Sequence, residues 1–159
     1  MTDANDIPPC LIFIDKEGRW FHKGAEMIHT AYIRLFYENI TLDDQGRYLI
    51  QWAGETCYVE VEDTAFVVRR VSFDPGRHPG SSRFMLTLSD ETEEALAPDT
   101  LYVGNENVLY CEVKEKRFPA RFLRSAYYQL AEHVVEEDGT YVLPLNGKTY
   151  PILTKHTYS

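Results

Sequence analysis

The segment Lys16–Phe21 reads KEGRWF, and the segment Lys114–Pro119 reads KEKRFP, so Lys-Glu-x-Arg-aromatic occurs once in each half of the chain. Both copies lie within a longer series of similar segments. In the same order, the matching pairs are Leu11–Ile14 with Val108–Cys111, Met27–Tyr32 with Phe122–Tyr127, Asp43–Tyr48 with Glu136–Tyr141, and Gly54–Thr56 with Gly147–Thr149. Similar segments in a common order are typical of an internal duplication. We predict a tandem duplication of a hairpin–helix–hairpin unit, with chance similarity of two common units as the alternative.

Helical spacing of apolar residues begins at Thr30 and again near Arg124. The pattern predicts helices near residues 30–41 and 124–135, with the hydroxyls of Thr30 and Ser125 as N-caps. The residues expected on the buried helical faces are Leu35, Phe36, Leu130 and Val134. Short apolar or alternating runs that end at turn signals predict strands. The expected strands cover residues 11–14, 19–22, 48–52, 57–61, 66–73, 84–88, 101–103 and 108–113.

These elements predict an α+β protein with two structurally related lobes. We expect a flexible tail at residues 1–9, an N-terminal α+β lobe at 10–64 and a C-terminal α+β lobe at 65–159. Two lobes that face each other create a cleft, and clefts between domains often bind small molecules. The sequence therefore favours a ligand site between the lobes.

The composition limits the class of protein. Of the 159 residues, 44% are hydrophobic and 13% aromatic, which is too much packing material for a disordered chain. The formal net charge of -9 argues against a general nucleic-acid surface, because such surfaces neutralise phosphates with basic side chains. The net charge does not exclude a local basic pocket. The first residues lack a basic leader region, and no apolar run approaches the ~20 residues that span a bilayer. We expect a soluble, cytoplasmic protein.

Cysteine and histidine give no metal or disulfide signature. Cys10, Cys57 and Cys111 are far apart and form no C-x-x-C, so we expect three reduced thiols. The five histidines lack the spacing of metal ligands on a helix, which predicts no metal site. The chain also lacks G-x-S-x-G, G-x-G-x-x-G and a Walker motif, so we expect no cofactor and no nucleophilic catalysis of a familiar kind.

A mixed polar, basic and aromatic set remains as the candidate ligand site. Its members are Trp20, His22, Lys23, Arg34, Glu62, Asp63, Arg117, Arg121 and Arg124. Guanidinium groups bind phosphate or carboxylate, and aromatic rings stack on planar groups, so this set suits a planar anionic ligand. The alternative is that the aromatic residues belong to the core and the arginines are solvated.

The run from Ile14 to Ile28, the Asp43–Tyr48 turn and Val59–Phe66 together resemble an uncharacterised bacterial family, domain of unknown function 1285. The resemblance implies a duplicated α+β core, a C-terminal lobe similar to pleckstrin-homology folds, a cleft for a nucleotide-like ligand and a role in signalling. The motif positions that it carries over are Trp20, His22, Gly24, Glu62, Asp63 and Phe66, and Phe66 thereby joins the candidate ligand-binding residues. His29 stands where the family pattern has Arg, and Thr64–Ala65 where it has Ala-Pro, which puts the grip on a phosphate in doubt.

The preferred interpretation is a non-enzymatic module that binds a small, nucleotide-like anionic ligand between the lobes or acts in signalling. One alternative is an enzyme acting on a nucleotide-like or acidic metabolite, with Glu62 or Asp63 as general base and His22 as its partner. Another is a protein-interaction adaptor, because a pleckstrin-like lobe can present a peptide groove. The sequence leaves the oligomeric state open.

Overall fold

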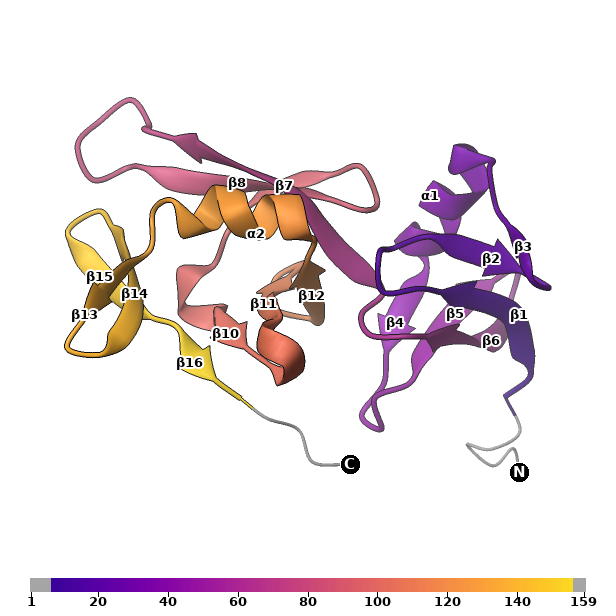
Figure 1. The fold of residues 1–159 in the computed structure, drawn as a ribbon. Helices are drawn as coiled ribbons and strands as arrows, with labels where there is room; N and C mark the ends of the chain where they lie inside the picture. The colour runs from indigo at the N-terminus through magenta and orange to yellow at the C-terminus, as the bar shows by residue number, and fades with distance from the viewer. Residues whose placement is uncertain (1–6, 156–159) are drawn as a thin grey trace. The chain divides into compact units, whose positions relative to one another are not determined.

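The computed structural model describes residues 7–155 of the chain. Contacts between residues divide the chain after Ala65 into two compact units, which we call the first unit and the second unit. Both combine strands with one α-helix, so the mixed α+β class is confirmed (Figure 1). The tail predicted for residues 1–9 lies largely outside the described residues, and strand β1 already begins at Pro9.

The first unit is built on a six-stranded sheet with the order β3-β2-β1-β6-β5-β4. Its strands are β1 (Pro9–Ile14), β2 (Trp20–His22), β3 (Ala25–Glu26), β4 (Ile40–Leu42), β5 (Tyr48–Trp52) and β6 (Glu55–Val61). Helix α1 (Thr30–Glu38) connects β3 to β4. The pairing of β1 with β6 is parallel and the other pairings are antiparallel, so the last strand of the unit returns to lie beside the first.

Trp20 on β2 joins α1 to the sheet. Its ring stacks on Phe36 at 6.2 Å and meets Tyr37 edge to face at 4.8 Å between ring centroids. The Tyr37 hydroxyl donates to the carbonyl of Ala65 at 2.8 Å, which ties the helix to the end of the unit. These contacts, with buried Ile14 and Ile50, form the core of the first unit.

The second unit contains two sheets. The larger has the order β16-β10-β11-β12-β7-β8-β9, and the smaller has the order β13-β14-β15. The strands are β7 (Phe66–Asp74), β8 (Arg83–Leu88), β9 (Glu93–Ala95), β10 (Tyr102–Val103), β11 (Leu109–Val113), β12 (Phe118–Phe122), β13 (Val135–Glu137), β14 (Thr140–Leu145), β15 (Lys148–Pro151) and β16 (Leu153–Thr154). Two short 3-10 helices, η2 (Pro98–Thr100) and η3 (Asn105–Asn107), flank β10.

Alternating burial along β11 and β12 shows which face of the large sheet forms the core. Leu109, Cys111 and Val113 are buried, and the residues between them are only half-buried.

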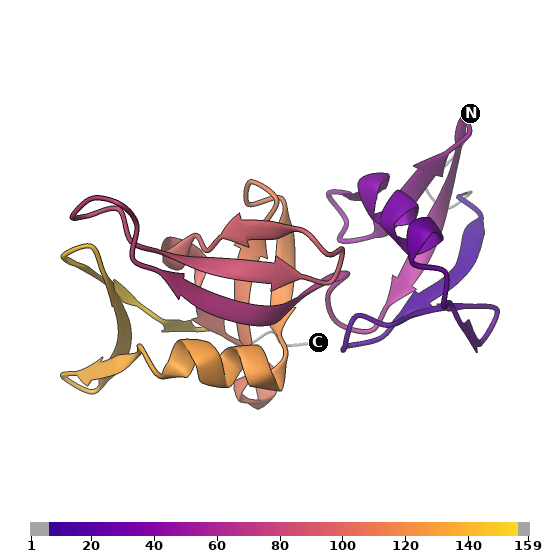
Figure 2. The ribbon, with the colours of Figure 1, turned by 90° about the horizontal axis from the view of Figure 1, so that it is seen from above.

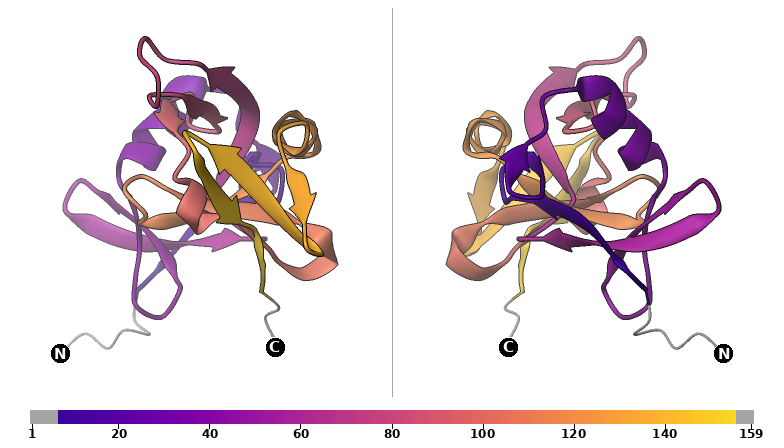
Figure 3. Two further views of the ribbon diagram at one scale, coloured as in Figure 1. Left: turned by 90° about the vertical axis from the view of Figure 1, so that its left-hand side faces the viewer. Right: turned by 90° about the vertical axis from the view of Figure 1, so that its right-hand side faces the viewer.

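Helix α2 (Arg124–Ala131) runs alongside β7 (Figure 2), where the backbone N–H of Val71 donates to the side chain of Gln129 at 2.7 Å. Seen end on in Figure 3 (left), α2 has the small sheet beside it.

Both predicted helices form, but their expected N-caps are wrong. His29 and Leu123 occupy the cap positions, and neither makes a side-chain capping bond. Thr30 is already the first residue of α1, and the Ser125 hydroxyl instead lies 3.5 Å from the carbonyl of Arg69.

The helices are also shorter than predicted, because strands take over their last residues. Ile40 pairs with Ile50, and Val135 pairs with Val142. Of the helical residues expected in the core, Leu130 is buried, while Leu35, Phe36 and Val134 are half-buried. The buried residue of α1 is Tyr37, because the helix turns this position toward Trp20.

The two hairpin–helix–hairpin segments share their order of elements but not their sheets. In the first unit, β6 returns to pair with β1. In the second unit, β12 pairs in parallel with β7, and β10 occupies the free edge of β11, so β13, β14 and β15 form a sheet of their own. The two copies therefore differ in strand order, since neighbouring strands outside the repeat decide the pairing, and the duplication stays a prediction.

The expectation of three free thiols is also wrong. Cys10 on β1 and Cys57 on β6 form a disulfide across neighbouring strands, with a Cα–Cα distance of 5.0 Å. The sequence gives no hint of this pair because 47 positions separate the two cysteines. Cys111 is free and buried. None of the helices in the described part of the chain is long and apolar enough to cross a membrane.

Candidate functional site

The aromatic members of the predicted ligand site are buried. Trp20 is 1% exposed between β2 and α1, and Phe66 is 1% exposed against Phe118, with 4.9 Å between the ring centroids. Neither ring offers a face on which a planar ligand could stack. The prediction that these two rings contact a ligand is therefore corrected. Each ring belongs to the core of its unit, as the alternative interpretation had it.

The indole Nε1 of Trp20 is buried and has no hydrogen-bond partner among the described residues. Buried donors are normally satisfied, so this atom is a place where a bound acceptor would be stabilised. In the packing seen here, however, the ring is enclosed by Phe36 and Tyr37 of α1.

The polar residues predicted in the first unit lie near the surface. His22 and Lys23 end β2 and are exposed, and Arg34 is exposed on α1. Glu62 accepts a hydrogen bond from the backbone N–H of Lys16 at 3.0 Å, whereas Asp63 is half-buried. Across the described residues, no hydrogen bond or ion pair joins His22 to Glu62.

The three predicted arginines of the second unit occupy different settings. Arg117 is exposed, and its Nε donates to the carbonyl of Lys114 at 2.9 Å. Arg121 is half-buried opposite Tyr110, and Arg124 is exposed at the start of α2. The predicted site combines residues of both units, so it stays a prediction.

A cavity within the second unit lies next to α2, and we call it the α2 pocket. Its volume is about 520 Å³, which is within the usual range for small-molecule sites. The lining residues are Val103, Asn107, Leu109, Tyr127, Ala131, Val134, Tyr141, Ile152 and Thr154. They come from α2, β10, η3, β11, β14 and β16 and from the residues just before β13 and β16, so elements distant in sequence assemble the pocket.

The α2 pocket has an apolar base and a hydroxyl-bearing rim. Leu109 is buried at its base, whereas Tyr127 and Tyr141 are 39% and 60% exposed. Thr154 and Asn107 add further polar groups at exposed positions. None of the nine lining side chains is ionised at neutral pH, so the pocket suits a largely apolar, uncharged molecule with a few hydrogen-bonding groups.

The helical pattern of the sequence indicated some of the residues that line the α2 pocket, but not that they line a pocket. Tyr127, Ala131 and Val134 follow the spacing of one helical face, and Val134 was expected to be buried in the core. The strands that complete the pocket are distant in sequence, so the helical pattern could not show that this face remains partly open.

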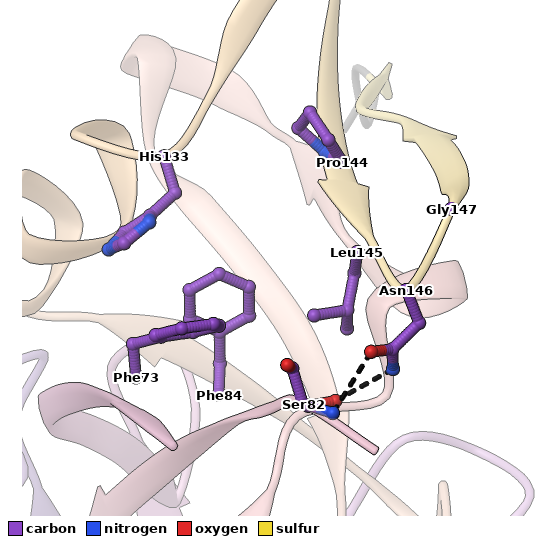
Figure 4. Close-up of a pocket in the computed structure, with 8 residues that line it drawn as sticks. All are labelled: Phe73, Ser82, Phe84, His133, Pro144, Leu145, Asn146 and Gly147. Carbon is purple, nitrogen blue, oxygen red and sulfur yellow. Dashed lines mark hydrogen bonds between the residues drawn. The ribbon is translucent and has the colours of Figure 1, made fainter. Parts of the chain in front are cut away.

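A second cavity of about 350 Å³ lies between the β7–β8 and β14–β15 loops (Figure 4). The His133 ring meets Phe84 at 4.9 Å and Phe73 at 5.5 Å between centroids. On the opposite side, the Asn146 amide accepts from the Ser82 N–H at 2.9 Å and donates to the Ser82 carbonyl at 2.8 Å. Both polar atoms of the Asn146 amide are already bonded, so they hold the two loops together and are not free to bind a ligand.

A third cavity, the bulge pocket, lies in the first unit. It has a volume of about 220 Å³ and is lined by Pro9, Leu11, Ile12, Phe13, Lys23, Gly24, Tyr58 and Glu60. It adjoins the disulfide, since Pro9 and Leu11 flank Cys10 and Tyr58 follows Cys57.

Fold and cavities define an α+β protein of two compact units with an uncharged pocket in the second. The fold is that of a DUF1285 family protein from Silicibacter pomeroyi, with a TM-score of 0.76 at 20% identity over 91% of this chain and 80% of that one. A DUF1285 family protein from Shewanella baltica gives a TM-score of 0.62 at 20% identity over 77% of this chain and 91% of that one. The resemblance seen in the sequence is thus confirmed at the level of the fold.

No protein-family model matches the sequence. The search of curated proteins gave no match either.

Proposed function

We propose that this chain is a non-enzymatic ligand-binding module of the DUF1285 family, and that it binds a small, uncharged and largely apolar molecule in the α2 pocket. The observation that carries the proposal is the combination of a volume of about 520 Å³ with a lining that has no ionised side chain. Burial of apolar ligand surface supplies the binding free energy in such a site, and a few hydroxyls fix the orientation.

The same lining favours binding over catalysis. A general acid or base needs a titratable group within hydrogen-bond reach of the reacting atoms. Tyr127 and Tyr141 bring phenol hydroxyls to the α2 pocket, and its lining residues include no carboxylate, imidazole, amine or thiol. The enzyme alternative based on Glu62, Asp63 and His22 draws on the first unit and gains no support from this pocket.

The nucleotide-like anionic ligand inferred from the sequence is a second candidate. It would use Arg117, Arg121 and Arg124, none of which lines the α2 pocket. The pleckstrin-like character of the second unit, the signalling role and a common ancestry of the two repeated segments stay predictions. A binding experiment can separate the two candidate ligand classes because they depend on different residues.

Thermal unfolding and calorimetric titration test the proposal with indole and 1-decanol as neutral probes, and with adenosine and guanosine monophosphates as anionic probes. A ligand at 100 times its Kd stabilises a folded protein by ~2.7 kcal/mol, which is readily seen as a rise in Tm. We expect the neutral probes to bind and the nucleotides to have no effect.

Variants on α2 locate the site. Ala131→Leu fills the pocket and should abolish binding of the neutral probes, and Tyr127→Ala should weaken it about fivefold. Tyr128→Ala is the matched control, because this neighbouring tyrosine is exposed and does not line the pocket. Binding of nucleotides that is lost in Arg124→Ala but kept in Ala131→Leu would instead support the anionic ligand.

A further inference from the structure

The pairing of β1 with β6 is interrupted where the two cysteines meet. Pro9 pairs with Tyr58 and Phe13 pairs with Glu60, so Cys10, Leu11 and Ile12 lie opposite Val59 alone. Leu11 takes a left-handed conformation with φ of 63° and is 53% exposed. The regular strand ladder therefore stops at this bulge, and the disulfide spans the gap.

Two prolines limit the hydrogen bonds that the residues before the bulge can make to β6. Pro8 and Pro9 have no N–H group, so this stretch can accept hydrogen bonds from β6 but not donate them. The backbone N–H of Tyr58 donates to the carbonyl of Pro8 at 2.9 Å. Leu11 accepts a hydrogen bond from the backbone N–H of Lys23 at 2.9 Å, and from Ile12 onward β1 pairs with β2. The bridge at Cys10 is thus a covalent attachment to β6 of the segment that precedes Leu11.

We propose that the Cys10–Cys57 bridge is a redox modification site that reacts with a dithiol reductant, and that its reduction frees the start of β1 from β6 and opens the bulge pocket. Pro9, Leu11, Tyr58 and Glu60 are among the residues that line that pocket. Pro9 moves with the freed segment, whereas Leu11 stays bonded to the Lys23 N–H, and Tyr58 and Glu60 stay in the β5–β6 hairpin. This inference concerns the first unit and does not depend on the function proposed for the second.

The reaction is thiol–disulfide exchange. A thiolate of the reductant attacks one sulfur of the bridge, which breaks the S–S bond, forms a mixed disulfide and releases the other cysteine as a thiolate that takes up a proton. The second thiol of the reductant then resolves the mixed disulfide. The bridge gains two electrons and two protons and becomes two thiols, and the reductant becomes a disulfide.

The position of the cysteines suits this reaction. Cys10 and Cys57 are both half-buried at the bulge, next to exposed Leu11, so a reductant can approach them. Cys111 differs, because burial, helped by the carboxylates of Glu94 and Glu112, raises the pKa of its thiol far above the ordinary range. A buried protonated thiol is a poor nucleophile, so Cys111 does not compete in the exchange.

Hydrogen exchange of the full chain before and after treatment with dithiothreitol tests the proposal. Mass spectrometry should first show that the untreated protein is two hydrogens lighter than its reduced form. On reduction, the amide of Tyr58 should exchange at least ~10-fold faster, because its acceptor on Pro8 is freed. The amide of Gln51, which donates to Asn39, is the internal control and should not change.

The double variant Cys10→Ser/Cys57→Ser should show the fast exchange of Tyr58 without reductant and no further response to it. Cys111→Ala should respond as the wild type does. A bridge that dithiothreitol cannot reduce in the folded protein would overturn the proposal, and so would unchanged exchange of Tyr58 after reduction. A protein that never contains the bridge under air would overturn it as well.

Discussion

The turn at Asp15–Arg19 joins β1 to β2, and the turn at Val113–Arg117 joins β11 to β12. Their sequences, DKEGR and VKEKR, share Lys-Glu-x-Arg, but the turns are stabilised differently. In the first turn, the Asp15 carboxylate accepts from the backbone N–H of Glu17 at 3.0 Å and of Arg19 at 2.9 Å, and from Arg19 Nε at 2.7 Å. The first turn therefore contains its own anchor.

The second turn depends on neighbouring elements. It has Val113 in place of the aspartate, and Lys114, Glu115 and Lys116 all take left-handed conformations. The Lys114 N–H donates to the Glu94 carboxylate at 3.2 Å, and the Lys114 ammonium lies 2.6 Å from Asp90. Two turns of similar sequence therefore form the same hydrogen bonds only when the residue that accepts those bonds is also shared.

A third turn supports this conclusion. Asp43–Arg47 reads DDQGR, and its carboxylate accepts from the N–H groups of Gln45 and Arg47 and from Arg47 Nε at 2.7 Å. It reproduces the first turn bond for bond although its middle residues differ. Aspartate at the first position, glycine at the fourth and arginine at the fifth are thus the residues that matter.

Removing the local anchor should have the largest effect. Asp15→Ala deletes three hydrogen bonds to a carboxylate and leaves part-buried turn amides without this acceptor, so we expect the first unit to lose about 2–3 kcal/mol of stability. Urea unfolding measures the loss. Glu17→Ala is the control, because this exposed side chain makes only a 3.6 Å contact with Arg19 and should change little.

Removing the tertiary anchor of the second turn should cost less. Lys114→Ala breaks the ion pair with Asp90, whose side chain is 8% exposed, and we expect a loss of about 1–2 kcal/mol. Lys116→Ala breaks an exposed pair with Asp99 and should have a much smaller effect on urea unfolding. Equal losses in the two variants would show that Asp90 does not anchor this turn.

Acid should loosen the first turn, because its anchor is a carboxylate. Burial alone would raise the pKa of Asp15, but hydrogen bonds from the Arg19 backbone and side chain and from the Glu17 backbone outweigh it and lower the pKa. The stabilisation is complete above the ordinary pKa of an aspartate, about 3.9, and is lost as the pH falls through the lowered value. We expect hydrogen exchange at the Arg19 amide, corrected for its intrinsic pH dependence, to lose protection below about pH 4.

The variant Asp15→Asn should abolish this change at Arg19. The Arg117 amide of the second turn bonds to the backbone carbonyls of Val113 and Lys114, so it has no carboxylate acceptor of its own. If the Arg19 amide stayed equally protected from hydrogen exchange at pH values far below the ordinary pKa of an aspartate, the role given to the Asp15 carboxylate would be contradicted.

Exchanging the residues before the two arginines should have the smallest effect. Gly18 has φ of 82°, a conformation that costs other residues about 1 kcal/mol, so Gly18→Ala should destabilise the first unit by that amount. Lys116 has φ of 63°, and Lys116→Gly should relieve its strain and raise Tm by a few degrees. A decrease in Tm for Lys116→Gly would show that its side chain matters more than its backbone.

Regular patterns allowed the sequence to predict the local structure. Alternation along Cys57–Val61 and the apolar spacing after Thr30 predicted β6 and α1, because the faces of strands and helices follow fixed periods. The candidate site was less accessible to such reasoning. Trp20 and Phe66 were chosen as ligand contacts, yet packing against α1 and β12 buries them.

The sequence by itself determined the elements, their order and the turns that carry their own anchor, since these depend on residues close together in the chain. Only the tertiary structure decided which strands pair, that Cys10 meets Cys57, and that strands distant in sequence enclose the α2 pocket. The physical reason is that strand partners, sulfur pairs and cavities depend on contacts between distant residues, and a single sequence records no distances. For the same reason, KEGRW and KEKRF read alike in the chain and are held in place by different neighbours.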